Sequence, residues 1–129
     1  MVNIIRTKLR RRKKAPSVDS VKEYIDASPP SKYNTLSESE DVFFLKKIYE
    51  IEINGGRREM CVEKIYDNTF LEKVAKTDRN EYVRLRAAKN FEGIEIIEWL
   101  MVNDASSRVR NYAKCIYNKT PNSMKFIMY

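Results

Sequence analysis

The sequence contains no histidine, and only two cysteines and three glycines among its 129 residues. Without histidine, a Ser-His-Asp triad, a Cys-His pair and a histidine-ligated metal are excluded. Two cysteines are too few for a zinc site or a disulfide framework. The glycines form neither a GxGxxG nor a GxxxxGK[ST] pattern, so the sequence holds no familiar phosphate-binding loop. We therefore expect no catalytic residue, no metal and no cofactor, and hence a protein that is not an enzyme.

Long apolar runs are missing as well. The longest apolar-rich stretch, residues 94–102, includes Glu95 and Glu98 and is about half as long as a membrane span requires. Apolar residues precede the N-terminal charges, which is the reverse of a secretory signal. Few and unpatterned cysteines are typical of a reducing environment. We therefore expect the cytoplasm or another reducing intracellular compartment, with no membrane contact.

Positive charge is concentrated at the N-terminus. The chain carries 25 basic and 18 acidic residues, a net charge of +7. Residues 1–14 account for the whole excess, because they hold seven basic residues and no acid. A run of like charges cannot bury apolar surface, so residues 1–19 are expected to form a flexible basic arm that attracts phosphate groups. A targeting segment and a solubilising tail are the other interpretations. The basic residues are Arg6, Lys8, Arg10, Arg11, Arg12, Lys13 and Lys14.

Residues 20–36 are predicted to be a short helix followed by a linker. Ser20 and Glu23 have the spacing of a capping box, and Pro29-Pro30 are expected to end the helix at about residue 27. Residues 28–36 are rich in serine and proline, as linkers are. A second capping box in residues 37–40 is expected to open the main domain, residues 37–129.

The main domain repeats itself with a period of twenty-six residues. Residues 44–65, 70–91 and 96–117 align, and residues 122–129 add a half repeat. Apolar residues recur at helical spacing in both parts of each copy, which predicts two short amphipathic helices per copy. The predicted fold class is therefore mostly α, a solenoid of short helix pairs.

Residues 49–62 admit a second interpretation. Apolar and polar residues alternate there around Asn54-Gly55, a pattern typical of a β-hairpin. Both the helix pair and the hairpin remain open for this segment. An incomplete first copy would also suit a capping unit, which repeat arrays need at their ends.

An acid and an arginine six residues apart recur in every copy. We expect the acid to accept hydrogen bonds from free amides at the turn between the helices and to pair with the arginine, whose planar fork makes bidentate bonds. The pairs are Glu52 with Arg58, Asp78 with Arg84, and Asp104 with Arg110.

The pattern D-x-x-x-x-V-R-x-x-A in residues 78–87 and 104–113 resembles HEAT-like helical repeats. The resemblance covers residues 44–129. It implies stacked helix pairs in a curved scaffold, with Asp78, Arg84, Asp104 and Arg110 as structural residues. The sequence departs from the family in its period, which is shorter than the usual ~40–47 residues, and in Arg57, which stands where the family has valine.

Basic and aromatic residues alternate on the predicted second helices, with Tyr82 and Tyr112 among the basic side chains. The HEAT-like resemblance implies that these helices line the concave face. Such a mixture is typical of contacts with single-stranded nucleic acid. We therefore expect the protein to bind RNA, DNA or a ribonucleoprotein through the basic arm and this face. The basic residues are Arg86, Lys89, Arg108 and Lys114.

Trp99 is the one tryptophan of the chain, and it occupies the repeat position held by Lys47, Lys73 and Lys125. Three lysines indicate that this position faces water, so the ring is expected to be partly exposed. Tryptophan is enriched in interface hot spots, and Trp99 with Tyr112 is the predicted protein interface. The alternative function is therefore a protein–protein adaptor, with the arm serving targeting or solubility. Packing of the ring over the edge of the core is the competing interpretation.

Overall fold

The second helix of every pair begins at the same interval along the chain. In the computed structural model, which describes residues 18–122 and side chains from residue 20, these helices start at residues 29, 55, 81 and 107. Each follows an N-cap residue whose side-chain oxygen accepts a backbone N–H of the first turn. The N-caps are Ser28, Asn54, Asn80 and Ser106, which recur at the period of the sequence repeat. Such caps satisfy donors that the helix itself leaves free.

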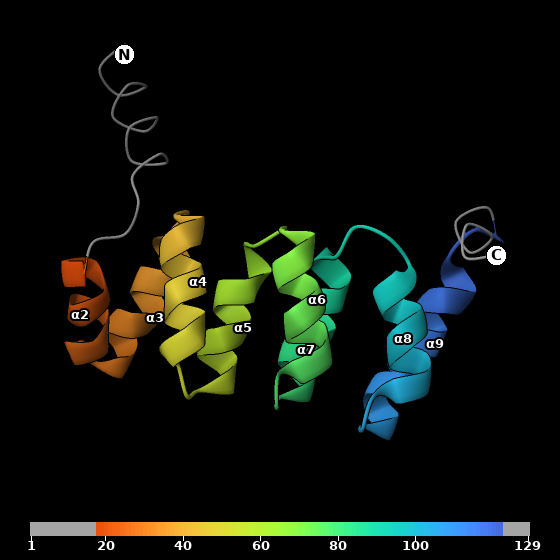
Figure 1. Ribbon diagram of the computed structural model, residues 1–129. Helices are drawn as coiled ribbons and strands as arrows, with labels where there is room; N and C mark the ends of the chain where they lie inside the picture. The colour runs from red at the N-terminus through yellow and green to blue at the C-terminus, as the bar shows by residue number, and fades with distance from the viewer. Residues whose placement is uncertain (1–17, 123–129) are drawn as a thin grey trace, which may run out of the picture. The chain divides into compact units, whose positions relative to one another are not determined.

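Residues 18–122 contain eight helices and no strand, so the predicted mostly α fold is confirmed, with the helices arranged as repeated pairs (Figure 1). The chain divides into two compact units, Met1–Ile65 and Tyr66–Tyr129. The first unit contains α2 (Val18–Asp26), α3 (Pro29–Glu38), α4 (Val42–Ile51) and α5 (Gly55–Glu63). The second contains α6 (Asn68–Thr77), α7 (Glu81–Asn90), α8 (Glu95–Asn103) and α9 (Ser107–Lys119).

In the first unit, α2 packs against α3 and α4, and α5 packs against α3 and α4. Leu36, Leu45, Ile48 and Val62 are fully buried between these helices. The Lys64 ammonium closes the end of α3, because Nζ donates to the carbonyls of Leu36, Ser37 and Ser39 at 2.9, 2.6 and 2.7 Å. A cation at a helix C-terminus satisfies carbonyls that lack a partner and complements the helix dipole.

In the second unit, α6 pairs with α7, α8 pairs with α9, and α6 contacts α8. Leu71, Val74 and Leu100 are buried on the first helices at the positions that the periodicity predicted. Ala87 and Ala113 are buried on the second helices, where small side chains let the helices of each pair approach closely. Asn68 ties the start of α6 to the turn before α8, since its side chain bonds both the N–H and the C=O of Glu92.

The linker predicted at residues 28–36 is instead the helix α3. Pro29 and Pro30 occupy its first two positions after the N-cap Ser28, where a helix needs no N–H and where the fixed φ of proline is already helical. The two prolines therefore begin α3, whereas the sequence predicted only that they end the preceding helix. Neither predicted capping box marks a helix start, because Ser20 lies inside α2 and Ser37 lies in the last turn of α3. The N-cap of α4 is Asp41, which accepts from the Phe44 N–H.

The hairpin alternative for residues 49–62 is wrong. This segment contains the end of α4, a short turn and most of α5. Asn54 caps α5, accepting the Arg57 N–H at 3.0 Å, and Gly55 is the first helical residue. Asparagine followed by glycine suits a helix start as well as a hairpin turn, because asparagine is among the preferred N-caps. The alternation of apolar and polar residues was therefore misleading.

Candidate functional site

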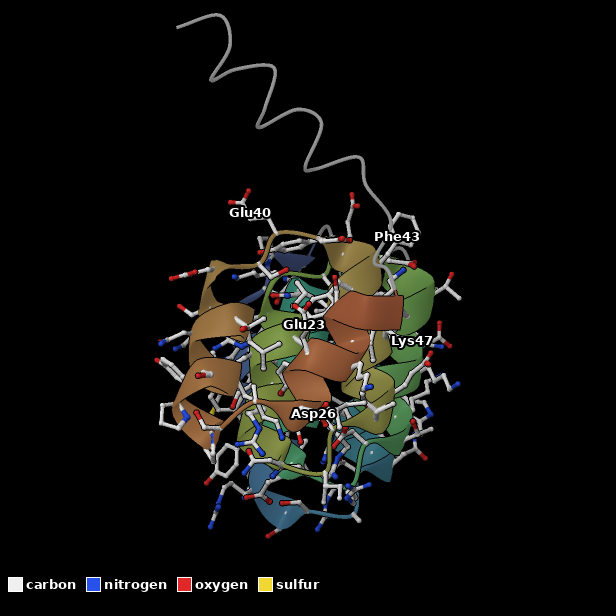
Figure 2. All side chains as sticks on the ribbon, turned by 90° about the vertical axis from the view of Figure 1, so that its left-hand side faces the viewer. Glu23, Asp26, Glu40, Phe43 and Lys47 are labelled. Carbon is white, nitrogen blue, oxygen red and sulfur yellow. The ribbon has the colours of Figure 1, made fainter. Side chains whose placement is uncertain are left out.

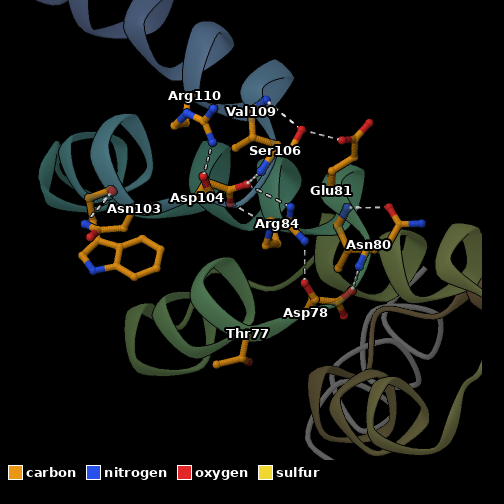
Figure 3. Close-up of polar contacts among 12 residues, drawn as sticks. Thr77, Asp78, Asn80, Glu81, Arg84, Asn103, Asp104, Ser106, Val109 and Arg110 are labelled. Carbon is orange, nitrogen blue, oxygen red and sulfur yellow. Dashed lines mark hydrogen bonds and ion pairs between the residues drawn. The ribbon is translucent and has the colours of Figure 1, made fainter.

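Arg84 links two successive pairs in the second unit (Figure 3). Its Nε and Nη2 donate to the two carboxylate oxygens of Asp104 at 2.8 and 2.9 Å, and its Nη1 donates to the main-chain carbonyl of Asp78 at 2.8 Å. The Asp104 side chain is 2% exposed and that of Arg84 12%. A bidentate salt bridge that is so little exposed to water fixes the distance between the α6–α7 and α8–α9 helix pairs.

The arginine and the acid of one copy meet differently from the predicted pairing. Within a copy, the arginine donates to the main-chain carbonyl of the acid, as Arg58 does to Glu52, Arg84 to Asp78 and Arg110 to Asp104. The acid's carboxylate accepts the N–H of the following N-cap residue, and in the case of Asp104 it also receives the arginine of the copy before. The six-residue spacing therefore serves a main-chain bond. We call this set of contacts the acid–arginine ladder.

Glu52 occupies the ladder position in the first unit with a different set of donors. The Tyr24 hydroxyl donates to Oε1 at 2.5 Å, Arg57 Nε donates to the same atom at 2.6 Å, and the Asn54 N–H donates to Oε2 at 3.1 Å. Burial raises the pKa of Glu52, but the hydrogen bonds from Arg57, Tyr24 and Asn54 outweigh it and lower the pKa to about 2. Burial and the same carboxylate raise the pKa of Tyr24. The half-buried Arg57 is thus engaged with the ladder acid of its own copy.

The buried Cys61 does not stand in a reactive setting. Burial, with a further contribution from the Glu52 charge, raises the pKa of Cys61 to about 12. A thiol with such a pKa is protonated at neutral pH and is a poor nucleophile. Cys115 is exposed on α9.

Three of the four basic residues predicted on the second helices share one surface with the tyrosines. Tyr82, Arg86 and Lys89 lie at i, i+4 and i+7 on α7, and Arg108 and Tyr112 lie at i and i+4 on α9, spacings that put side chains on one side of a helix. Tyr82 is 52% exposed and Tyr112 41%. We call this surface the α7/α9 face.

Side chains cross between the two helices of the α7/α9 face. Arg108 Nη1 donates to Glu81 Oε1 at 2.5 Å and to the Tyr82 hydroxyl at 2.9 Å. The Lys89 ammonium lies 5.2 Å from the centre of the Tyr112 ring, within cation–π range. Arg86 is half-buried between them along α7. Glu81 was not singled out from the sequence, although its position beside Tyr82 at the start of α7 was a usable signal.

Lys114 lies apart from this face. It follows Arg110 by four residues, so the two share a different side of α9. Its side chain is exposed. The seven basic residues of the arm and most of the half repeat at 122–129 fall outside the described residues.

Trp99 is half-buried on α8, whereas Lys47 and Lys73 at the equivalent positions are exposed. The Lys76 ammonium from α6 lies 5.3 Å from the centre of the indole ring and pairs with Glu72 at 3.0 Å. The sequence did not predict this contact, because Lys76 and Trp99 are brought together only by the packing of α6 on α8. One side of the ring is therefore occupied by a cation from the neighbouring pair.

The part of the chain that the structure describes holds no cluster of three or more potential metal ligands. Within the same residues, every helix falls short of the length and hydrophobicity that crossing a bilayer requires. A shallow depression of about 330 Å³ runs along α6, lined by polar and charged side chains and by Phe91. Comparisons with protein-family models, curated proteins and solved structures gave no match.

Proposed function

We propose that this protein binds single-stranded nucleic acid through the α7/α9 face together with the basic arm of residues 1–14. The observation that carries the proposal is the alternation of basic and aromatic side chains across two neighbouring helices. Tyr82 and Tyr112 supply exposed rings on which bases can stack, and Arg86, Lys89 and Arg108 supply charge for phosphates.

The charge of the two helices supports this proposal. Together α7 and α9 carry seven basic residues and one acid, Glu81, whereas α8 carries two acids and no basic residue. The α7/α9 face is also confined to the second unit. Its positions are occupied in α5 by Gly56, Met60 and Glu63, which offer neither a ring nor a cation.

The test removes the rings and keeps the charge. Tyr82→Ala combined with Tyr112→Ala should weaken binding of a labelled oligouridylate of about 16 nucleotides at least ~10-fold, because each stacked base contributes about 1–3 kcal/mol. Binding is measured by fluorescence anisotropy on protein first washed free of nucleic acid at high salt. The matched control is Tyr33→Ala with Tyr66→Ala, which removes two even more exposed tyrosines (59% and 71%) outside the α7/α9 face. Equal losses in the two double variants would contradict the proposal.

We further propose that the helix pairs are HEAT-like repeats of unusually short period. The ladder between Arg84 and Asp104, and the equivalent positions of the four N-caps, support this proposal. Two free cysteines, one of them exposed, fit the cytoplasm or another reducing compartment.

A protein–protein adaptor centred on Trp99 is the second candidate function. The observation in its favour is that this large ring stays half-exposed where the other copies have lysine. Trp99→Lys should leave the melting temperature within a few degrees of wild type and leave oligouridylate binding unchanged. Loss of oligouridylate binding would show that Trp99 belongs to the nucleic-acid site. Unfolding would show that the ring belongs to the core.

A further inference from the structure

The sequence positions of the acid–arginine ladder recur one copy further toward the N-terminus than the sequence comparison indicated. Its acids stand at Asp26, Glu52, Asp78 and Asp104, and its basic positions hold Lys32, Arg58, Arg84 and Arg110, so both series follow the period of the repeat. Asp26 ends α2, two residues before the N-cap Ser28, just as Asp104 stands two residues before the N-cap Ser106. The α2–α3 pair therefore has an acid at the ladder position, although Asp26 makes none of the contacts that the ladder acids of the later copies make.

The Asp26 carboxylate is the unused acid of this ladder. Its side chain is exposed, and within residues 18–122 it has no hydrogen-bond or ion-pair partner. The basic residue of the same copy does not reach it, because the Lys32 ammonium lies over the Tyr24 ring, 5.5 Å from the ring centre. Figure 2 looks onto α2 and shows Asp26 and Glu23 on the side of the helix that faces the viewer.

Arg110 is the corresponding unused donor. Its Nη1 donates to the Asp104 carbonyl at 2.6 Å, as Nη1 of Arg84 does to the Asp78 carbonyl (Figure 3). The remaining edge of the guanidinium, Nε and Nη2, has no partner among the described residues. In Arg84 the same two atoms hold the Asp104 carboxylate. A half-buried guanidinium is thus oriented by its main-chain bond and presents two donors that fit a carboxylate.

We propose that two copies of this chain associate head to tail, with Arg110 of one copy binding Asp26 of the next. The contact continues the ladder, in which Arg84 already holds the acid of the following helix pair. Lys114 lies one turn from Arg110, and Glu23 lies one turn from Asp26, so a second pair of opposite charges accompanies the first. The interface is heterologous, because Arg110 and Asp26 belong to two different surfaces of the chain.

Charge complementarity favours a second copy of this chain over other occupants. The α9 side of the contact offers Arg110 and Lys114, and the α2 side offers Glu23 and Asp26. At the equivalent positions of α7, inside the second unit, the neighbours of Arg84 are the buried Leu85 and Ala88. In α9 these positions hold Asn111 and Lys114, so the contact between copies is polar and hydrated. Such a contact is weak and sensitive to salt.

The experiment is sedimentation velocity on the full chain, from about 10 µM to about 1 mM protein, at low and high salt. Wild type should form species larger than a monomer at low salt and return to monomer at high salt. Asp26→Ala and Arg110→Ala should each shift the association midpoint at least ~10-fold to higher concentration. The matched controls are Glu40→Ala and Lys119→Ala, which remove exposed charges elsewhere and should associate as wild type does.

A mixture of the two variants separates this contact from any other mode of association. Asp26→Ala retains Arg110 and Arg110→Ala retains Asp26, so the mixture can form one native junction and no second one. It should therefore give a dimer that does not grow with concentration, at protein concentrations where each variant alone remains monomeric. Asp26→Ala keeps the test informative if Arg110→Ala fails to fold, since Asp26 is exposed and makes no internal bond among the described residues.

Three results would overturn the proposal. The first is a wild type that stays monomeric throughout the low-salt series. The second is association that survives Asp26→Ala, which would place the contact on another surface. The third is a mixture that grows beyond the dimer or stays monomeric.

Discussion

At the scale of single residues, the ladder acid accepts hydrogen bonds from different side chains in different copies. Asp104 receives the fork of Arg84, whereas Glu52 receives a tyrosine hydroxyl and the Nε of an arginine from its own copy. Both carboxylates also accept the N–H of the N-cap residue that follows. In these two copies the acid therefore serves the turn between the helices in the same way, whereas its side-chain partner differs.

Arg84 and Arg110 should differ in their effect on stability although they occupy the same repeat position. Arg84→Ala removes a bidentate bond and leaves the Asp104 carboxylate buried, so it should lower the free energy of unfolding by about 3 kcal/mol. Arg110→Ala removes a single bond to a carbonyl and should cost about 1 kcal/mol. Urea unfolding measures both values, with the exposed Arg108→Ala as the control. Equal losses for Arg84 and Arg110 would show that the bond to Asp104 carries no extra stability.

Glu52 should make the protein less stable in acid. Its pKa is lowered to about 2 in the folded state from a reference value of 4.5. A carboxyl with a lowered folded pKa contributes stability above the unfolded pKa and loses it as the pH falls toward the folded one. The free energy of unfolding should therefore fall between about pH 4.5 and pH 2. Glu52→Gln should be less stable at neutral pH by ~2 kcal/mol and should show a flatter dependence on pH in this window.

At the scale of elements, α3 shows how a helix begins in a segment that contains two prolines. Ser28 accepts the Ser31 N–H, and its carbonyl accepts the Lys32 N–H at 2.9 Å. The prolines lack an N–H, but an N–H at the first positions of a helix would find no carbonyl acceptor within that helix. The cap therefore determines where the chain turns from α2 into α3.

Ser28→Ala should destabilise the protein by about 1 kcal/mol, the usual cost of losing an N-cap. Since α3 packs on α5, the loss should appear in the global thermal transition measured by circular dichroism. Ser37→Ala is the matched control, because Ser37 lies exposed in the last turn of the same helix. If Ser28→Ala melts at the same temperature as the control, the Ser28 cap does not stabilise α3.

The helix pairs of residues 42–119 were predictable from sequence because buried residues such as Leu71 and Ile97 recur at the repeat period. The α2–α3 pair was not, because α2 has Asp19 and Lys22 where α4 has Leu45 and Ile48. The bridge from Arg84 to Asp104 was missed for another reason: a six-residue spacing within each copy suggested a local pair. Which carboxylate an arginine reaches depends on how successive helix pairs stack. The sequence alone does not give the distance between the arginine and each carboxylate.

At the scale of the whole molecule, charge separates into a neutral body and a basic arm. The net charge of +7 equals the number of basic residues in positions 1–14. Under the proposed function, the arm supplies long-range attraction to phosphates and the α7/α9 face supplies contacts with bases. The two contributions should therefore respond differently to salt.

Deletion of residues 1–14 should weaken oligouridylate binding and flatten its dependence on salt. If four to six of the seven charges meet phosphates, the slope of log K against log salt should fall by roughly 3–5. Binding is measured between about 50 and 200 mM salt. The Tyr82→Ala/Tyr112→Ala variant is the counterpart, because it should lower affinity without changing the slope. An unchanged slope in the truncated protein would assign the arm to targeting or solubility.

The constant interval between Ser28, Asn54, Asn80 and Ser106 has a consequence for how such a chain can change in length. A segment that starts at any of these N-caps and ends before the next contains one whole repeat. Duplicating residues 80–105 within the gene would give the new pair its own cap, its own acid and an arginine for the acid that follows. Duplication of this segment therefore preserves the cap, the acid and the bond between successive helix pairs, whereas an insertion of another length breaks the register. Duplication of a whole repeat is thus the change in length that this architecture tolerates best.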